Sequence, residues 1–199
     1  MPGWGLVLSL LAGCAAVPTV PHVPADGLPV DVGCSAAPLV PPVDATRDEL
    51  RVSRAFGVAG HRGEDWSDFG ANGRALGAPV HSVAAGVVVF AGSGDRDGYT
   101  GWGNVVIMRH RIPRGAARPD QEVESLYGHL ESVTVRPGQK VCASQVEGTI
   151  GTGGGRYAAH LHFEIRERLG LGVQAGSGAL DGWVDPSEWL ASHGVSTMP

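Results

Sequence analysis

The chain has 199 residues, 43% of them hydrophobic, which is enough for one compact domain with its own core. Its 31 glycines and 14 prolines argue against a helical bundle and favour short strands joined by tight turns. The formal net charge is −5 and no run of lysine or arginine occurs. This charge argues against a nucleic-acid partner, because nucleic-acid binding requires clustered positive charge.

Residues 1–14 have the features of a secretory signal peptide. Trp4–Ala12 is apolar except for one serine, too short to span a membrane as a helix but long enough for a signal-peptide core. The segment ends in Leu11-Ala12-Gly13-Cys14, which resembles the lipobox of bacterial lipoproteins and implies cleavage before Cys14 and a lipid on its sulfur. The first three residues contain no lysine or arginine, so a plain signal peptide or a start codon assigned too late are the alternatives. We expect a lipoprotein of the cell envelope, anchored to the membrane and facing the periplasm or the cell exterior.

The chain contains three cysteines. If Cys14 carries lipid, Cys34 and Cys142 remain as an even pair in an oxidising compartment, where a disulfide between them is possible. Such a bond would tie the N-terminal tail to the body of the domain. Two unpaired thiols are the alternative that the spacing leaves open.

Residues 15–45 form a proline-rich stretch, with seven prolines between Pro18 and Pro42. This density is incompatible with a regular helix or strand and predicts a semi-extended tether between lipid and domain. The globular domain is then expected over residues 46–199. It begins with Thr46-Arg47-Asp48-Glu49, a capping-box pattern that predicts a short helix over residues 46–53.

Short apolar runs punctuated by glycine follow from about residue 55. They predict strands over residues 80–90, 105–109, 123–130, 133–135 and 161–166. Near the end, Asp185-Pro186-Ser187-Glu188 has the cap and first turn of a helix that Gly194 would close. The expected fold is mainly β, with antiparallel sheets forming a sandwich-like or half-barrel domain with short helices.

Histidines and a glutamate alternate along the segment His160-Leu161-His162-Phe163-Glu164-Ile165. In a strand, the two imidazoles and the carboxylate would lie on one face and the apolar side chains on the other. Two imidazoles on one face indicate metal binding or acid–base chemistry. A half-exposed strand with solvated histidines is the alternative, but it gives no reason for an imidazole-rich face.

A second polar cluster contains His61 and Asp65, four residues apart around a glycine. Zinc accepts imidazole nitrogen and carboxylate oxygen, and a catalytic site takes three protein ligands. These two residues and one histidine of the 160–165 segment would make up that number. Taken alone, this spacing is also typical of an ordinary polar loop. His129 lies at the end of an apolar run, a position that is, taken alone, typical of a structural histidine.

Taken in order, these motifs resemble the lysostaphin-type zinc peptidoglycan peptidases. The resemblance lies in His61-x-Gly63-x-Asp65, Tyr127-x-His129-Leu130 and His160-Leu161-His162-Phe163-Glu164, and it covers roughly residues 55–192. Shorter segments that also match are Ala78-Pro79-Val80, Ala85-Gly86-Val87-Val88, Gly101–Ile107, Gly138-Gln139-Lys140-Val141 and Val184-Asp185-Pro186.

The resemblance implies a role for each residue of the site. His61, Asp65 and His162 would bind Zn²⁺, His160 would act as general base toward the attacking water, and His129 would donate a hydrogen bond to the developing oxyanion. Glu164 would either orient a histidine from behind or form a surface salt bridge.

The expected function is a zinc-dependent endopeptidase that hydrolyses peptide bonds in peptidoglycan stem peptides or cross-links. The alternative is a non-catalytic wall-binding regulator of other cell-wall hydrolases, since some relatives of this fold have lost metal ligands. Retention of all three ligands and both catalytic histidines favours the enzyme. The bond cleaved, a glycine bridge or a D-Ala–diaminopimelate link, and the oligomeric state are left open. Loops near residues 93–103 and 111–122 are expected to set specificity.

Overall fold

The computed structural model describes residue 34 and residues 39–69, 73–95, 100–114 and 118–196. Within these residues the fold is mainly β, with one short α-helix, as predicted. The strands are β1 (Arg51–Arg54), β2 (Glu64–Ser67), β3 (Pro79–His81), β4 (Gly86–Ser93), β5 (Asn104–Ile112), β6 (Gln121–Val133), β7 (Lys140–Val141), β8 (Val146–Ile150), β9 (Leu161–Arg166) and β10 (Trp183–Val184). The helical elements are the 3-10 turn η2 (Val58–Gly60) and α1 (Pro186–Ser192).

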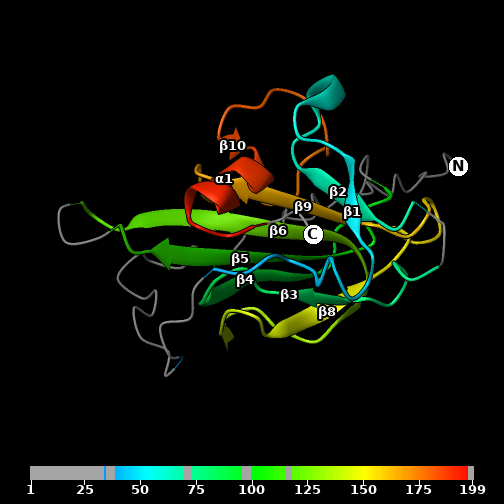
Figure 1. Ribbon diagram of the computed structural model, residues 1–199, viewed down its shortest axis with the longest axis horizontal. Helices are drawn as coiled ribbons and strands as arrows, with labels where there is room; N and C mark the ends of the chain where they lie inside the picture. The colour runs from blue at the N-terminus through cyan, green and yellow to red at the C-terminus, as the bar shows by residue number, and fades with distance from the viewer. Residues whose placement is uncertain (1–33, 35–38, 70–72, 96–99, 115–117, 197–199) are drawn as a thin grey trace, which may run out of the picture.

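All strands belong to one antiparallel sheet, which is not closed into a barrel (Figure 1). The order along the sheet is β1-β2-β9-β6-β5-β4-β7; β10 pairs with β9, β8 pairs with β6, and β3 pairs with β8. Strand β6 is the branch point, because its 13 residues pair with β5, β8 and β9. Strand β1 is an edge strand of the sheet and lies beside β2.

Strand β9 has the predicted bounds and the predicted alternation. Leu161, Phe163 and Ile165 lie in the main hydrophobic core, which α1 also joins through Trp189 and Leu190. The opposite face is also buried, because a smaller apolar cluster and the site cover it. The residues of β9 therefore alternate because one face of the strand packs in the hydrophobic core and the other face carries the polar side chains.

The prediction of a helix over residues 46–53 is wrong. Residues 45–49 form turns instead, and Arg51–Arg54 is strand β1. The carboxylate of Asp44 accepts the backbone N–H of Arg47 at 2.9 Å, which caps a tight turn and not a helix. The buried side chain of Leu50 then directs the chain into its pairing with β2.

The apolar run predicted as one strand over residues 80–90 is divided into β3 and β4. Strand β3 pairs with β8, whereas β4 pairs with β5 and β7. Gly86 begins β4, where an added Cβ would lie 2.4 Å from the carbonyl oxygen of Arg109. This close backbone contact requires glycine, and it allows the chain to change partners.

Helix α1 confirms the capping pattern read near the C-terminus. The Asp185 side chain accepts the backbone N–H of Glu188 at 3.0 Å, Pro186 occupies the first turn, and Gly194 has a φ of 82° just after the helix.

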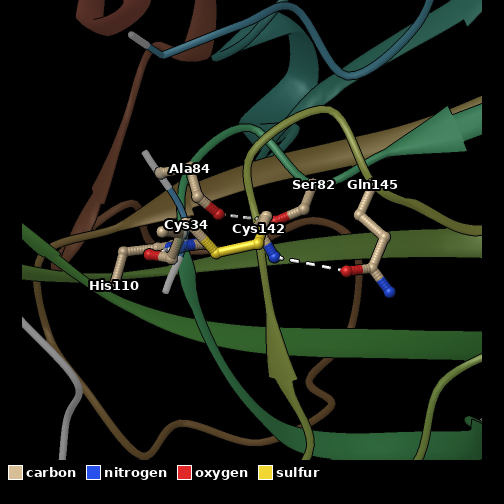
Figure 2. Close-up of a disulfide and its surroundings, with 7 residues drawn as sticks. Cys34, Ser82, Ala84, His110, Cys142 and Gln145 are labelled. Carbon is tan, nitrogen blue, oxygen red and sulfur yellow. Dashed lines mark hydrogen bonds between the residues drawn. A yellow bond between two sulfur atoms is a disulfide. The ribbon is translucent and has the colours of Figure 1, made fainter. Parts of the chain in front are cut away.

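A disulfide joins Cys34 to Cys142, with their Cα atoms 5.6 Å apart (Figure 2). Figure 2 also shows the Gln145 side chain accepting the backbone N–H of Cys142 at 3.3 Å, beside the turn between β7 and β8. Of the two alternatives that the sequence leaves open, the structure has the paired one. The disulfide fastens the C-terminal end of the predicted tether to the domain. Cys14, the expected signal peptide and most of residues 15–45 lie outside the described residues. The lipid anchor, the signal peptide and the tether therefore remain predictions.

No helix within the described residues is long and apolar enough to cross a membrane.

One of the buried carboxyl groups, that of Glu147, lies away from the site without a hydrogen-bond partner among the described residues. Glu147 lies on β8 and is fully buried. Burial therefore raises the pKa of Glu147 well above its ordinary value of 4.5. The contribution of Glu147 to the free energy of unfolding is fully present below pH 4.5, where both the folded and the unfolded chain hold the proton. It is lost as pH rises toward the folded-state pKa, because only the unfolded chain then releases the proton.

Replacing Glu147 by methionine should raise the free energy of unfolding by about 1–3 kcal/mol near neutral pH, because it removes a buried polar group without a partner. The gain should be larger at about pH 8 than at about pH 5, because the unfolded wild-type chain releases this proton as pH rises and the folded chain does not. Denaturant unfolding of both proteins at the two pH values measures it. Glu131→Met, at an exposed position of β6, is the control and should show no such pH-dependent gain. An equal gain at both pH values would contradict the assignment.

Candidate metal centre

Three segments bring His61, Asp65 and His162 together. Strands β2 and β9 pair so that Asp65 lies directly opposite His162. His61 follows η2 and is held by a bridge to Ser177. Between the two ligands of this segment lies Gly63, where an added Cβ would be 2.3 Å from the Phe163 carbonyl oxygen. Only glycine lets the chain run this close to β9, so the sheet requires the glycine of the His-x-Gly-x-Asp motif.

The donor atoms of the three side chains form a small triangle. Nε2 of His61 lies 3.0 Å from Nδ1 of His162 and 3.2 Å from Oδ1 of Asp65. The third side, from Nδ1 of His162 to Oδ1 of Asp65, is 3.0 Å. The residues are 2%, 9% and 2% exposed for His61, Asp65 and His162. A small cation at the centre would therefore be shielded on its protein side.

This triangle fits zinc. Tetrahedral zinc with bonds of about 2.0–2.2 Å to nitrogen and oxygen holds its ligand atoms roughly 3.3 Å apart. The measured separations of 3.0–3.2 Å are close to that value. Two imidazoles and one carboxylate are also a donor set of catalytic zinc, which leaves a fourth position for water or substrate.

The remaining nitrogens of the two ligand rings have acceptors of their own. Nδ1 of His61 donates to the carbonyl oxygen of Ala55 at 3.2 Å, and Nε2 of His162 donates to the Glu164 carboxylate at 2.9 Å. These bonds leave His61 Nε2 and His162 Nδ1 as the atoms that face a metal, and they fix the orientation of each ring.

Glu164 is held in turn by a buried network. Its second oxygen accepts from Nε of Arg166 at 2.7 Å and from Nε1 of Trp183 at 2.6 Å. Burial tends to raise the pKa of Glu164, but the Arg166 charge and the His162 hydrogen bond outweigh it and lower the pKa to about 2. Glu164 is only 1% exposed. Of its two expected roles, the structure has the one that orients a histidine; a surface salt bridge is excluded by burial.

Asp65 and His162 each shift the pKa of the other through the hydrogen bond between them. Burial tends to raise the pKa of Asp65, but hydrogen bonds from His162 and His61 hold it well below its usual range. Burial tends to lower the pKa of His162, but the hydrogen bonds to Asp65 and Glu164 raise it to about 9. Without a cation, Nδ1 of His162 therefore carries a proton that Asp65 accepts. A metal ion bound here would replace that proton, so that its affinity would depend on pH.

His160 stands beside the triangle, immediately before β9. Its Nδ1 donates to the carbonyl oxygen of Ala158 at 2.8 Å, because a carbonyl can only accept. In the neutral ring, Nε2 then carries the lone pair. This atom lies 3.7 Å from Oδ1 of Asp65, so the lone pair is available at the edge of the centre.

His129 lies at an irregular position in the pairing of β6 with β5, with a φ of 63°, which is rare for a residue with a side chain. Both its backbone N–H and its Nδ1 donate to the carbonyl oxygen of Trp102, at 2.9 and 3.2 Å. Burial, with help from neighbouring His162 and His160, lowers the pKa of His129 to about 3. The ring is therefore neutral near pH 7, with its Nε2 an acceptor. The centroids of the His129 and His160 rings are 4.6 Å apart.

The five residues border one open cleft of about 500 Å³. The other lining residues are Arg54, Thr100, Gly101, Trp102, Tyr157, Ala175, Gly176 and Ser177. Loop 93–103 contributes Thr100, Gly101 and Trp102 to this lining, whereas the described part of loop 111–122 contributes no lining residue. The role of both loops in specificity stays a prediction. Arg54 and residues 175–177 were not predicted from the sequence. The sequence pattern of β1 does not indicate that Arg54 lines a cleft. Residues 175–177 lie in a segment without helical or strand periodicity.

The chain matches Peptidase family M23 over residues 60–175, more than half of its length, and it belongs to that family. It is similar to the "Lipoprotein NlpD/LppB homolog" of Pseudomonas aeruginosa, 39% identical over 93 residues, covering 47% of this chain and 27% of the relative. It is also similar to the "Murein hydrolase activator NlpD" of Escherichia coli, 34% identical over 120 residues, covering 59% and 26%. The chain therefore spans about a quarter of the length of these curated relatives.

Among solved structures, lysostaphin from Staphylococcus simulans is similar, with a TM-score of 0.51 and 26% identity over 75% of this chain and 52% of that one. A solution structure of lysostaphin has a TM-score of 0.53 at 24% identity, covering 79% and 57%, and supports the fold alone. The resemblance to lysostaphin-type peptidases inferred from the motifs is confirmed.

Zinc stoichiometry tests the triangle. The purified wild-type protein should hold about one zinc per chain, and His162→Ala should hold less than about one tenth, because two donors without the third no longer form a catalytic site. Metal analysis after dialysis gives both values. His193→Ala, which removes a histidine just beyond α1, is the matched control and should retain zinc. Full zinc content in His162→Ala would contradict the ligand assignment.

Proposed function

We propose that the protein is a zinc-dependent endopeptidase that hydrolyses peptide bonds in peptidoglycan stem peptides or cross-links. The observation that carries this proposal is the triangle of His61, Asp65 and His162 with two further imidazoles beside it on one open cleft. Membership of Peptidase family M23 supports the same reaction class. We also propose peptidoglycan as the partner, and a lipid on Cys14 as the anchor to the membrane of the cell envelope.

The proposed reaction divides the work among the cleft residues. Zinc held by His61, Asp65 and His162 would polarise the scissile carbonyl and lower the pKa of water to about 7. His160 takes the proton of the attacking water at Nε2, because its Nδ1 proton is engaged by Ala158. The same nitrogen then delivers the proton to the leaving amine.

The role of His129 follows from its tautomer. Donation to an oxyanion, the role expected from the resemblance, requires a proton on Nε2. The Trp102 carbonyl holds the proton of the neutral ring on Nδ1, and the low pKa opposes a second one. We therefore assign neutral His129 to accept a hydrogen bond from the attacking water at Nε2 and so to orient it toward the carbonyl, alongside His160.

The second candidate function is regulation of other cell-wall hydrolases. The observation that favours it is the name of the Escherichia coli relative, a murein hydrolase activator. A regulator that binds wall without cleaving it has no need for a complete donor set. In this chain all three donors, both neighbouring histidines and the supporting Glu164 are present, which supports the enzyme.

Digestion of purified peptidoglycan, with mass analysis of the fragments, distinguishes the two functions. The zinc-loaded protein should release peptide fragments, and a chelator should stop the release. His160→Ala should keep its zinc while losing about 10²–10⁴-fold in rate, because it removes the general base alone.

Each unexpected outcome has a distinct meaning. Normal cleavage by His160→Ala would show that the base is another group. No cleavage by a fully zinc-loaded wild type would leave regulation as the better function, which stimulation of a separate wall hydrolase would then test directly.

A further inference from the structure

Arg54 lies beside the metal centre through the pairing of the edge strand. Strand β1 lies beside β2 (Figure 1). Arg54 is the last residue of β1 and pairs with Asp65 on β2, just after a register shift between Val52 and Arg54. Directly opposed residues of an antiparallel pair have their side chains on the same face, with Cβ atoms roughly 5 Å apart. Both residues line the cleft. The sheet therefore fixes where the Arg54 side chain starts, next to a ligand of the metal.

The guanidinium of Arg54 is not committed to the fold. The side chain is exposed and donates one long hydrogen bond, 3.4 Å, to the carbonyl oxygen of Val58. Within the described part of the chain it forms no ion pair; Asp65 is instead contacted by His61, His160 and His162. This leaves most of its five donors available to a molecule in the cleft.

The charge of Arg54 is also uncompensated within the cleft. Among the lining residues, Arg54 and Asp65 are the two with a permanent charge. The carboxylate of Asp65 faces the two ligand histidines, and a divalent cation would add positive charge. The remaining lining groups are imidazoles, hydroxyls, aromatic rings and small side chains. The cleft therefore favours an anionic group at the Arg54 end.

We propose that Arg54 binds a free carboxylate of the substrate beside the scissile bond, so that the protein selects acidic peptides. The guanidinium fork matches a carboxylate in bidentate geometry, which supplies direction as well as attraction. This assignment rests on the proposed function and selects between the bonds that the sequence left open. A D-Ala–diaminopimelate cross-link carries a carboxylate on the residue at the bond, whereas a glycine bridge carries none there.

The test compares two synthetic cross-linked peptides that differ in one group, the free carboxylate of diaminopimelate and its amide. Each is made with a reduced, non-hydrolysable bond for equilibrium binding and with the natural bond for cleavage. The zinc-loaded wild type, Arg54→Gln and Arg51→Gln are assayed with all four. Arg51 is the matched control, because it is an exposed arginine of the same strand that does not line the cleft.

The wild type should bind the acid about 5- to 10-fold more tightly than the amide, and the ratio should shrink at high salt, as expected of an exposed charge pair. Arg54→Gln should bind both peptides equally, at the affinity of wild type for the amide. Arg51→Gln should keep the wild-type ratio. Cleavage of the natural peptides should follow the same pattern in KM.

A wild-type ratio near one would overturn the assignment, and so would a ratio that persists in Arg54→Gln. If the binding ratio appears as expected but neither natural peptide is cleaved, Arg54 is the carboxylate site and the proposed hydrolysis is wrong. Cleavage without any binding preference would have the opposite meaning: the hydrolase stands and Arg54 does not select its substrate.

Discussion

The pairing of Asp65 with His162 across β2 and β9 is the contact on which the rest of the site depends. A slip of one residue would turn one of these side chains to the opposite face of the sheet, because side chains alternate along a strand. Gly63 protects this register, since any side chain there would collide with the Phe163 carbonyl oxygen. A second pairing, between β1 and β2, places Arg54 beside Asp65. The donor triangle and the proposed substrate contact therefore meet at Asp65 on β2.

Behind the triangle, buried polar groups hold the ligand rings in place. Glu164 links His162 to Arg166 and Trp183 where water has almost no access. Burying an ion pair brings little net stability, because desolvation offsets the attraction. Its value here is positional: the carboxylate determines which nitrogen of His162 faces the cleft. Carbonyl oxygens of Ala158 and Trp102 do the same for His160 and His129. Each reactive nitrogen is thus set by a bond on the far side of its ring.

The parts of the fold that local pattern controls could be predicted from the sequence. Strand β9 alternates between core and site, and α1 carries its own cap in Asp185 and Pro186. Strand β2 could not be predicted, because Glu64-Asp65-Trp66-Ser67 has no apolar alternation although all four residues are buried. Its polar side chains are satisfied by distant partners, such as Ser187 for Glu64. These partners lie 97 residues away for Asp65 and 123 residues away for Glu64, so the pairings leave no local pattern in the sequence.

The candidate site divides in the same way. The histidines and Asp65 could be predicted because the chemistry restricts those positions to a few residue types in a fixed order. The tautomers could not, because they depend on backbone carbonyls that the fold brings near. Arg54 and residues 175–177 enter the cleft through strand register and loop path, which no motif encodes.

We propose that two imidazole nitrogens and one carboxylate oxygen form a three-donor zinc site with a fourth position open. X-ray absorption at the zinc edge of the zinc-loaded protein tests this site. We expect a four-coordinate shell of nitrogen and oxygen at about 2.0–2.1 Å, with the outer-shell signature of two imidazoles. A shell of six oxygens, or one with a single imidazole, would contradict it.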